Sequence, residues 1–211
     1  MIDSTHVRVL ILLLIILCEF PSQAQEPPTP PPNQTIKQHD RLKVGHPAPD
    51  FILQDVEGQN PVTLSKLKGR PVVLTFGSCT CPVFVSTTRR KTVQQYEAYK
   101  DKAYFYIVYI REAHPLDGWA IPRNSFSVNT PHSMAERQAI ARAFVQRLHT
   151  PIPVVVDTIN DQVQQAYASF PNRTVIIDGA GNVAYKGKAN PTGVASSAPQ
   201  VAKVLDKLLK P

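Results

Sequence analysis

Two cysteines one residue apart, Cys79 and Cys81, are the side chains of this 211-residue chain best suited to chemistry. The thiolate is the nucleophilic form of cysteine, and a thiol at a helix N-terminus feels the positive end of the helix dipole, which can lower its pKa. A disulfide between the two would close a small, strained ring, and strained disulfides are readily reduced. The pair therefore indicates thiol redox chemistry, with two inert buried thiols as the alternative.

The residues around the pair predict a strand that runs directly into a helix. Residues 71–76 are apolar and β-branched, which is typical of a central strand. Residues 83–100 contain no glycine or proline and predict a helix with Pro82 in its first turn. This order places Cys81 at a helix N-terminus and makes it the candidate nucleophile.

The remaining elements predict an α/β domain. Further strands are expected at residues 51–53, 62–64, 103–110, 152–156, 174–178 and 183–186, and further helices after Ser133, around 161–169 and after Ser197. This order is typical of a thioredoxin-like fold, with a central mixed sheet flanked by helices. Residues 111–132 form a long insertion rich in Pro, Gly, Asp and Asn, and a loop of that length usually carries function.

Two of the predicted helices begin at serine caps. Ser133 and Glu136 form a capping box, and Ser197 is the expected cap of the last helix. The apolar faces expected to pack inward are Ile140, Phe144, Val145 and Leu148 in the first, and Val201, Val204, Leu205 and Leu208 in the second.

The N-terminus has the pattern of an export signal. Residues 9–18 are an unbroken apolar run, too short to span a bilayer comfortably, so a cleaved signal peptide over 1–24 is the first interpretation and an uncleaved anchor the alternative. Residues 25–43 are proline-dense and predict an extended linker to a domain at 44–211. The domain is therefore expected outside the cytoplasm, periplasmic or secreted, or held at a membrane by the N-terminal segment.

Charge and motifs exclude several classes of function. The net charge is +7, and the basic residues are dispersed except for Arg89, Arg90 and Lys91, which are best explained as a solvated helix face. Attraction to anionic substrates or lipid surfaces stays open. The sequence has no nucleic-acid motif, no metal-ligand spacing and no glycine-rich nucleotide loop. We therefore expect no nucleic acid, no metal and no bound cofactor.

Several motifs resemble known thiol and selenol enzymes. Two segments resemble the opening of peroxiredoxins and extracytoplasmic thiol reductases, namely Val-Gly-His-Pro-Ala-Pro-Asp-Phe (44–51) and Leu-Lys-Gly-Arg-Pro-Val-Val-Leu (67–74). Four segments resemble the iodothyronine deiodinase family, namely Phe-Gly-Ser-Cys-Thr-Cys-Pro (76–82), Tyr-Ile-Arg-Glu-Ala-His-Pro-Leu-Asp-Gly-Trp (109–119), Pro-Val-Val-Val-Asp-Thr (153–158) and Tyr-Lys-Gly-Lys (185–188). The similarity covers roughly residues 44–210.

The chain departs from this family at two positions. Members that act on thyroid hormones typically carry selenocysteine where this chain has Cys81, and the family's Glu-Glu-Ala-His motif begins here with Arg111. By resemblance, Cys81 stands for the selenolate that attacks iodine. The thioredoxin motif has its second cysteine three residues on, where this chain has Phe84, so the resemblance leaves resolution to Cys79 or to an outside thiol.

The resemblance also implies roles for residues of the long loop. His114 and His132 would supply protons to the substrate, for which the near-neutral pKa of histidine is suited. Glu112 would orient a histidine or join a proton relay, with a solvated loop carboxylate as the alternative.

Substrate-binding roles fall to four other residues. Tyr109 would line the pocket or merely pack, and Ser78 and Thr80 would hydrogen-bond the thiolate or satisfy their own loop. Lys188 lies near the position where the family places a cationic partner for the substrate's acidic group, with a plain surface lysine as the alternative.

Three functions fit these residues. The first is a deiodinase-like thiol oxidoreductase that removes iodide from an iodothyronine or related iodinated phenol, with an external thiol or thioredoxin-like protein as reductant. The second is a peroxiredoxin-like or thiol-disulfide reductase acting on peroxide or disulfides. The third is a thioredoxin-like module that binds a partner without turnover. The family tends to dimerise, so a homodimer is an expectation of the resemblance alone.

Overall fold

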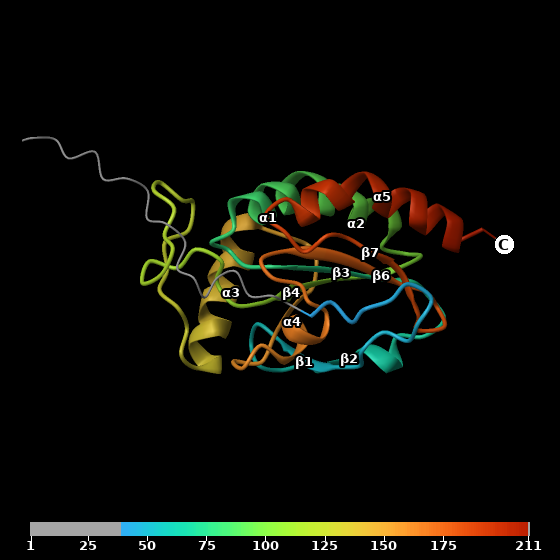
Figure 1. Ribbon diagram of the computed structural model, residues 1–211, viewed down its shortest axis with the longest axis horizontal. Coiled ribbons are helices and arrows are strands. Elements are labelled where there is room, and N and C mark those ends of the chain that lie inside the picture. Colours follow the sequence, from blue (N-terminus) through green and yellow to red (C-terminus); the bar gives the residue numbers. More distant parts are fainter. Residues whose placement is uncertain (1–38, 211) are drawn as a thin grey trace, which may run out of the picture.

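A mixed sheet of seven strands, flanked by helices, forms the centre of the protein (Figure 1). The computed structural model describes residues 39–210, so the predicted signal segment at 1–24 and most of the predicted linker at 25–43 lie outside the described residues. The strand order is β2-β1-β5-β4-β3-β6-β7. The strands are β1 (Ile52–Asp55), β2 (Val62–Thr63), β3 (Val72–Gly77), β4 (Tyr104–Tyr109), β5 (Val154–Val156), β6 (Arg173–Ile177) and β7 (Val183–Lys186).

Three parallel strands, β3, β4 and β5, form the middle of the sheet, and all six residues of β3 are buried. Strand β3 pairs with β4 from Val72 opposite Tyr104 to Gly77 opposite Tyr109, and β6 and β1 add antiparallel on the two sides. Parallel strands end at a common edge of the sheet. The segments that follow β3, β4 and β5 therefore meet there, which brings the cysteines close to the start of the long loop.

Helices cover both faces of the sheet. They are α1 (Pro82–Thr87), the π-helical segment η3 (Thr88–Thr92), α2 (Val93–Tyr99), α3 (Met134–Leu148), α4 (Gln162–Ala166) and α5 (Gly193–Leu208), with a short 3-10 turn η2 (Leu64–Lys66). Helices α1, α2 and α5 lie together over one face, α4 lies on the other, and α3 stands beside the long loop (Figure 1). Within residues 39–210, no helix has the length and apolar character needed to cross a membrane.

The helix predicted at residues 83–100 is present, but it is not uniform. It starts at Pro82 as expected and continues through a π-helical turn, η3, before α2 ends at Tyr99. The exposed side chains of η3 include Arg89, Arg90 and Lys91, which agrees with a solvated basic face. A π turn inserts one residue into the helical repeat without requiring glycine or proline, so composition gives no sign of it.

The prediction that Ser197 caps the last helix is wrong. Helix α5 begins four residues earlier, at Gly193, and the buried Ser197 hydroxyl donates to the Gly193 carbonyl at 2.7 Å. The N-cap residue is Thr192, whose side chain makes no capping bond; Asn172 caps the helix from another segment, since its Oδ1 accepts the Val194 N–H at 2.8 Å. The expected inward face is confirmed, since Val201 and Leu205 are buried and Val204 and Leu208 pack against the core.

The predicted cap of α3 is present with one change. The Ser133 hydroxyl accepts the Glu136 N–H at 3.2 Å, whereas the Glu136 carboxylate accepts the N–H of His132, one residue before the cap. Phe144 of this helix is fully buried against Phe84 and Tyr109, while Ile140, Val145 and Leu148 are partly buried at the edge of the core. Helix α3 is thereby fixed against the strand end that carries the cysteines.

The chain enters the domain through an ionic anchor at Asp40. Its Oδ2 lies 2.8 Å from Arg173 Nη2 and 3.1 Å from Lys186 Nζ. Arg173 is 2% exposed and also donates to three backbone carbonyls, and Leu42 is 3% exposed. The last residues of the predicted linker are thus packed on strands β6 and β7 rather than held away from them.

Removing the Asp40 charge is expected to destabilise the domain. Burial alone would raise the pKa of Asp40, but hydrogen bonds and charge from Arg173 and Lys186 lower it, so its stabilisation is present above the unfolded pKa and is lost as pH falls through the folded one. Because Asp40 is partly exposed, Asp40→Asn should lower the free energy of unfolding by only about 1 kcal/mol near neutral pH. Urea titrations should show that the difference from wild type shrinks below about pH 4.

The exposed pair of Glu97 and Lys100 offers a matched control. Glu97→Gln removes one carboxylate from an ion pair without uncovering a buried arginine, so its stability should stay close to that of wild type. Equal losses in the two variants would contradict a special role for Asp40.

Candidate active site

The cysteine segment is a tight turn between β3 and α1. Strand β3 ends at Gly77, and a Cβ at this position would lie 2.2 Å from Phe84 Cδ2, so only glycine lets the helix pack this closely. The Cys81 N–H donates to the Ser78 carbonyl at 3.1 Å, and the Cys81 carbonyl accepts the Val85 N–H at 3.0 Å. Cys81 is therefore the N-cap residue of α1, as predicted.

The Cys81 sulfur lies among hydrogen-bond donors but is buried. Asn172 Nδ2 donates to Sγ at 3.3 Å, and Cys81 is 2% exposed. Burial raises the pKa of Cys81, while the N–H groups of Phe84 and Val83 and the Asn172 amide lower it without cancelling the effect of burial. The expectation of a lowered pKa is therefore wrong, because removing the thiolate from water outweighs the helix terminus.

A buried carboxylate, Glu112, joins the end of β4 to the cysteine turn. It is 5% exposed, and its Oε1 accepts the Tyr109 hydroxyl at 2.6 Å. Its Oε2 accepts the Thr80 hydroxyl at 2.6 Å, the Thr80 N–H at 3.2 Å and the Cys79 thiol at 3.6 Å. The interpretation of Glu112 as a solvated loop residue is therefore wrong. Within residues 39–210, the Glu112 carboxylate is hydrogen-bonded to these groups and not to a histidine ring.

Hydroxyl groups complete the connection between the two loops. The Ser78 hydroxyl accepts the Ala113 N–H at 3.1 Å, and the Thr80 hydroxyl accepts the His114 N–H at 3.1 Å while donating to Glu112. The Tyr109 hydroxyl also accepts the Cys79 N–H at 3.2 Å. Ser78, Thr80 and Tyr109 are thus engaged in fixing the loops to each other.

His114 is half-buried beside the cysteine turn. Its ring contacts Trp119 edge-on at 4.5 Å, and Nδ1 lies 3.1 Å from the Trp119 carbonyl. A carbonyl can only accept, so Nδ1 carries a hydrogen and Nε2 is the basic nitrogen of the neutral ring. Burial lowers the pKa of His114, although the Trp119 carbonyl opposes the shift, so burial favours the neutral ring.

His132 and Lys188 are not tied to the cysteine turn. His132 is exposed, and its backbone N–H donates to Glu136 at 2.6 Å. Lys188 is exposed in the loop after β7. No hydrogen bond or ion pair within residues 39–210 joins either side chain to Cys79 or Cys81, so their roles stay predictions.

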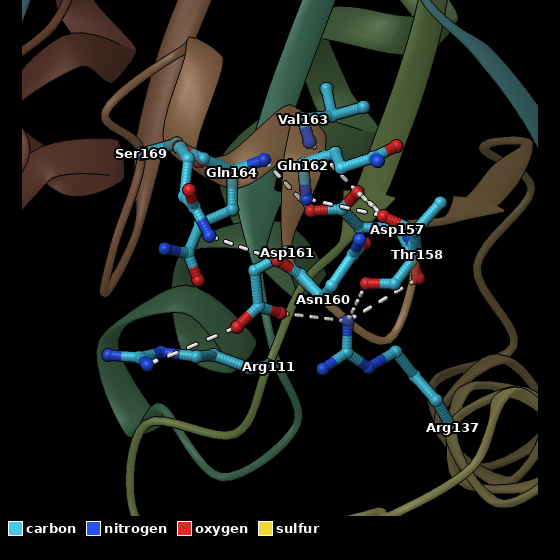
Figure 2. Close-up of polar contacts among 11 residues, drawn as sticks. Arg111, Arg137, Asp157, Thr158, Asn160, Asp161, Gln162, Val163, Gln164 and Ser169 are labelled. Atoms are coloured by element: carbon cyan, nitrogen blue, oxygen red, sulfur yellow. Dashed lines mark hydrogen bonds and ion pairs between the residues drawn. The ribbon is translucent and has the colours of Figure 1, made fainter.

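A second polar cluster supports the same edge of the sheet (Figure 2). Arg137 of α3, 2% exposed, lies 2.9 Å from Asp161 and donates to the Thr158 carbonyl at 2.6 Å. Arg111 approaches the other oxygen of Asp161 at 3.9 Å and stacks over the Phe170 ring at 4.3 Å. Arg111, which departs from the family motif, thus places a cation at the start of the long loop, where it contacts the segment before Asn172.

Two amide side chains of the site could not be predicted from the sequence. Asn124 Nδ2 donates to the Thr80 carbonyl at 2.7 Å, and Asn172 contacts Cys81. Neither lies in a motif that marks chemistry, and both reach the turn from distant segments. Among residues 39–210, no group of three or more His, Cys, Asp or Glu side chains could hold a metal ion.

The two cysteines should differ in reactivity. Burial and then the Glu112 charge raise the pKa of Cys79, whose thiol also donates to that carboxylate, whereas Cys81 has amide donors. We expect iodoacetamide near pH 8 to alkylate Cys81 about tenfold faster than Cys79 in the native chain. Fragment-ion mass spectrometry locates the label. In guanidinium chloride the two rates should converge, and equal rates in the native chain would contradict the assignment.

Neutralising Glu112 should change how stability depends on pH. Burial raises the pKa of Glu112, although its hydroxyl donors lower it. A raised folded pKa gives stability that is complete below the unfolded value of about 4.3 and is lost as pH rises through the folded value. Relative to Glu112→Gln, wild type should therefore lose stability in urea titrations as the pH rises above about 4. The exposed Glu57→Gln is the control, and parallel curves for wild type and Glu112→Gln would contradict the shift.

The fold is shared with solved thiol-disulfide proteins. A putative protein disulfide isomerase from Bacteroides thetaiotaomicron superposes with a TM-score of 0.56 at 22% identity, covering 79% of this chain and 92% of that one. A putative thiol:disulfide interchange protein from Chlorobium tepidum gives 0.56 at 20% identity, covering 78% and 99%. These similarities confirm the thioredoxin-like fold.

Curated sequences relate the chain to one family. It is 34% identical over 175 residues to the type I iodothyronine deiodinase of Xenopus laevis, covering 82% of this chain and 66% of that one. It is 35% identical over 153 residues to the thyroxine 5-deiodinase of Ovis aries, covering 71% and 51%. The chain thus spans about half to two thirds of the length of these relatives. The family model of iodothyronine deiodinase matches residues 32–209, and the chain belongs to that family.

Proposed function

We propose that this protein is a deiodinase-like thiol oxidoreductase that removes iodide from an iodothyronine or a related iodinated phenol. The observation that carries the proposal is the position of Cys81 in a chain of the deiodinase family: it is the N-cap residue of α1, and its sulfur accepts an amide hydrogen bond. Such a sulfur is a nucleophile once deprotonated.

The proposed reaction has two stages. The Cys81 thiolate attacks iodine, so that an S–I bond forms, the C–I bond breaks and the ring carbon keeps the electron pair and takes up a proton. A thiol then attacks the Cys81 sulfur, releasing iodide and forming a disulfide, and a second thiol reduces that disulfide to restore Cys81.

The geometry favours an external thiol for the first attack on the Cys81 intermediate. Burial and Glu112 hold Cys79 in its protonated form, and its Sγ lies 3.6 Å from Glu112 Oε2. A protonated thiol is a poor nucleophile. Resolution by Cys79 would also require the strained ring of a disulfide between cysteines one residue apart.

We assign proton transfer at the site to His114. Its backbone N–H donates to the Thr80 hydroxyl, and its Nδ1–H donates to the Trp119 carbonyl, so Nε2 of the neutral ring is the atom that takes up a proton and then passes it to the substrate. His132 and Lys188 are proposed to act on parts of the substrate that lie farther from the sulfur, since both are exposed. Ser78, Thr80 and Tyr109 act by positioning the loops.

The proposed location is extracytoplasmic, from the signal pattern at residues 1–24, with an N-terminal membrane anchor as the alternative form. The proposed reductant is a small thiol or a thioredoxin-like protein. No bound cofactor is part of the proposal, and a homodimer is proposed from family membership alone.

Iodide release tests the proposal. We expect the full chain with dithiothreitol to release iodide from an iodothyronine and Cys81→Ser to lose at least about a hundredfold of that rate, because serine is far less nucleophilic at neutral pH. Cys79→Ser is the matched control and should retain activity with this external thiol.

A parallel assay with hydrogen peroxide separates the alternatives. Peroxide consumption that depends on Cys81, without iodide release, would replace the proposal with a peroxiredoxin-like reductase. A chain that is silent in both assays would instead be a thioredoxin-like binding module.

A further inference from the structure

We propose that Asn172 is a catalytic residue whose side-chain amide hydrogen-bonds the Cys81 sulfur and stabilises it as the attacking thiolate. Asn172 Nδ2 lies 3.3 Å from Cys81 Sγ, and Asn172 is fully buried. The inference rests on Cys81 as the nucleophile of the proposed function. Asn172 lies just before β6 and belongs to none of the catalytic motifs of the sequence.

The direction of the amide is fixed by two backbone groups. Asn172 Oδ1 accepts the Val194 N–H at 2.8 Å, and Nδ2 donates to the Pro191 carbonyl at 3.1 Å. An N–H can only donate and a carbonyl can only accept, so the two partners determine which end of the amide is which. The edge turned towards Cys81 is therefore a hydrogen-bond donor.

A donor at this place favours the charged form of the sulfur. A thiolate accepts hydrogen bonds strongly and a thiol weakly, so a fixed N–H group stabilises the anion selectively. The other groups that act on Cys81 are the backbone N–H groups of Val83 and Phe84, which act in the same direction, and the Glu112 carboxylate, which opposes them. Asn172 is thus a neutral side-chain donor that offsets part of the cost of burying this thiolate.

The surroundings hold Asn172 before substrate arrives. A Cβ on Gly193 would lie 2.5 Å from the Asn172 carbonyl and 3.1 Å from its Oδ1, so glycine permits this close packing. On one side along the chain, Phe170 lies beneath the Arg111 guanidinium at 4.3 Å, and on the other, Arg173 is anchored by Asp40. A donor fixed in advance needs little reorganisation when the charge forms.

Asn172 also caps α5, so a test has to separate the cap from the contact with sulfur. Asn172→Asp does so, because a carboxylate caps a helix at least as well as an amide yet turns an acceptor towards Cys81. Asn172→Ala removes both interactions. Asn190→Ala is the matched control, since the Asn190 side chain accepts from Thr192 in the same loop and has no hydrogen bond to the sulfur among residues 39–210.

The experiment measures the Cys81 thiol directly. In the full chain carrying Cys18→Ser and Cys79→Ser, Cys81 is the remaining cysteine. The rate of alkylation by iodoacetamide against pH gives its pKa: the thiolate forms the S–C bond and iodide leaves. We expect Asn172→Ala to raise the pKa of Cys81 by about one unit, so that alkylation at pH values below this pKa becomes about tenfold slower. Asn172→Asp should raise the pKa of Cys81 further. Asn190→Ala should match its parent.

Circular dichroism melts identify which variants are folded. If Asn172→Ala does not fold, Asn172→Asp, which keeps the cap of α5, tests whether Asn172 stabilises the Cys81 thiolate. A folded Asn172→Asp chain with an unchanged Cys81 profile overturns the inference, because a cap alone would behave in that way. An equal shift in Asn190→Ala also overturns it. The alkylation assay uses no iodinated phenol. If the protein released no iodide from an iodothyronine, the proposed function would be rejected, but the measured pKa of Cys81 would still test the role of Asn172.

Discussion

The geometry of the site depends on the buried Glu112 carboxylate and on the donors that surround it. A carboxylate that is 5% exposed is costly to bury, and it is tolerated here because Tyr109, Thr80 and Cys79 all donate to it. These donors come from the end of β4 and from the turn after β3. The need to satisfy one charge therefore fixes two loops against each other, and the Thr80 hydroxyl extends the connection to His114.

The same constraint divides the roles of the two cysteines. Cys79 faces Glu112 and is held as a thiol, while Cys81, two residues further along, faces the Asn172 amide. A difference of environment over one intervening residue is possible because the chain passes from the turn at Cys79 to the N-terminus of α1 at Cys81, so the two side chains meet different neighbours. The pair is thus asymmetric in the folded protein although the sequence presents two identical side chains.

Much of the fold could be predicted from local patterns. The buried strands, the helix after Pro82, the cap at Ser133 and the hairpin of β6 and β7 follow from apolar periodicity and turn residues. The start of α5 could not, because its cap, Asn172, lies 22 residues before the N–H that it accepts. Within the site, Cys81, Glu112 and His114 carried recognisable motifs. Asn172 and Asn124 did not, since an asparagine in a loop has many ordinary explanations. Only tertiary packing brings these two side chains to the cysteine turn.

The burial of Cys81 has a consequence for the kinetics of any reaction at its sulfur. At 2% exposure, the residue is covered by protein atoms, so a reagent meets the thiolate only during excursions of the surrounding chain. The observed rate is then a product of the thiolate fraction and the fraction of time for which the cover is displaced far enough for that reagent. A peroxide molecule needs a smaller excursion than a two-ring iodinated phenol. The depth of Cys81 is therefore a size-dependent filter, and its effect is separate from the intrinsic reactivity of the sulfur.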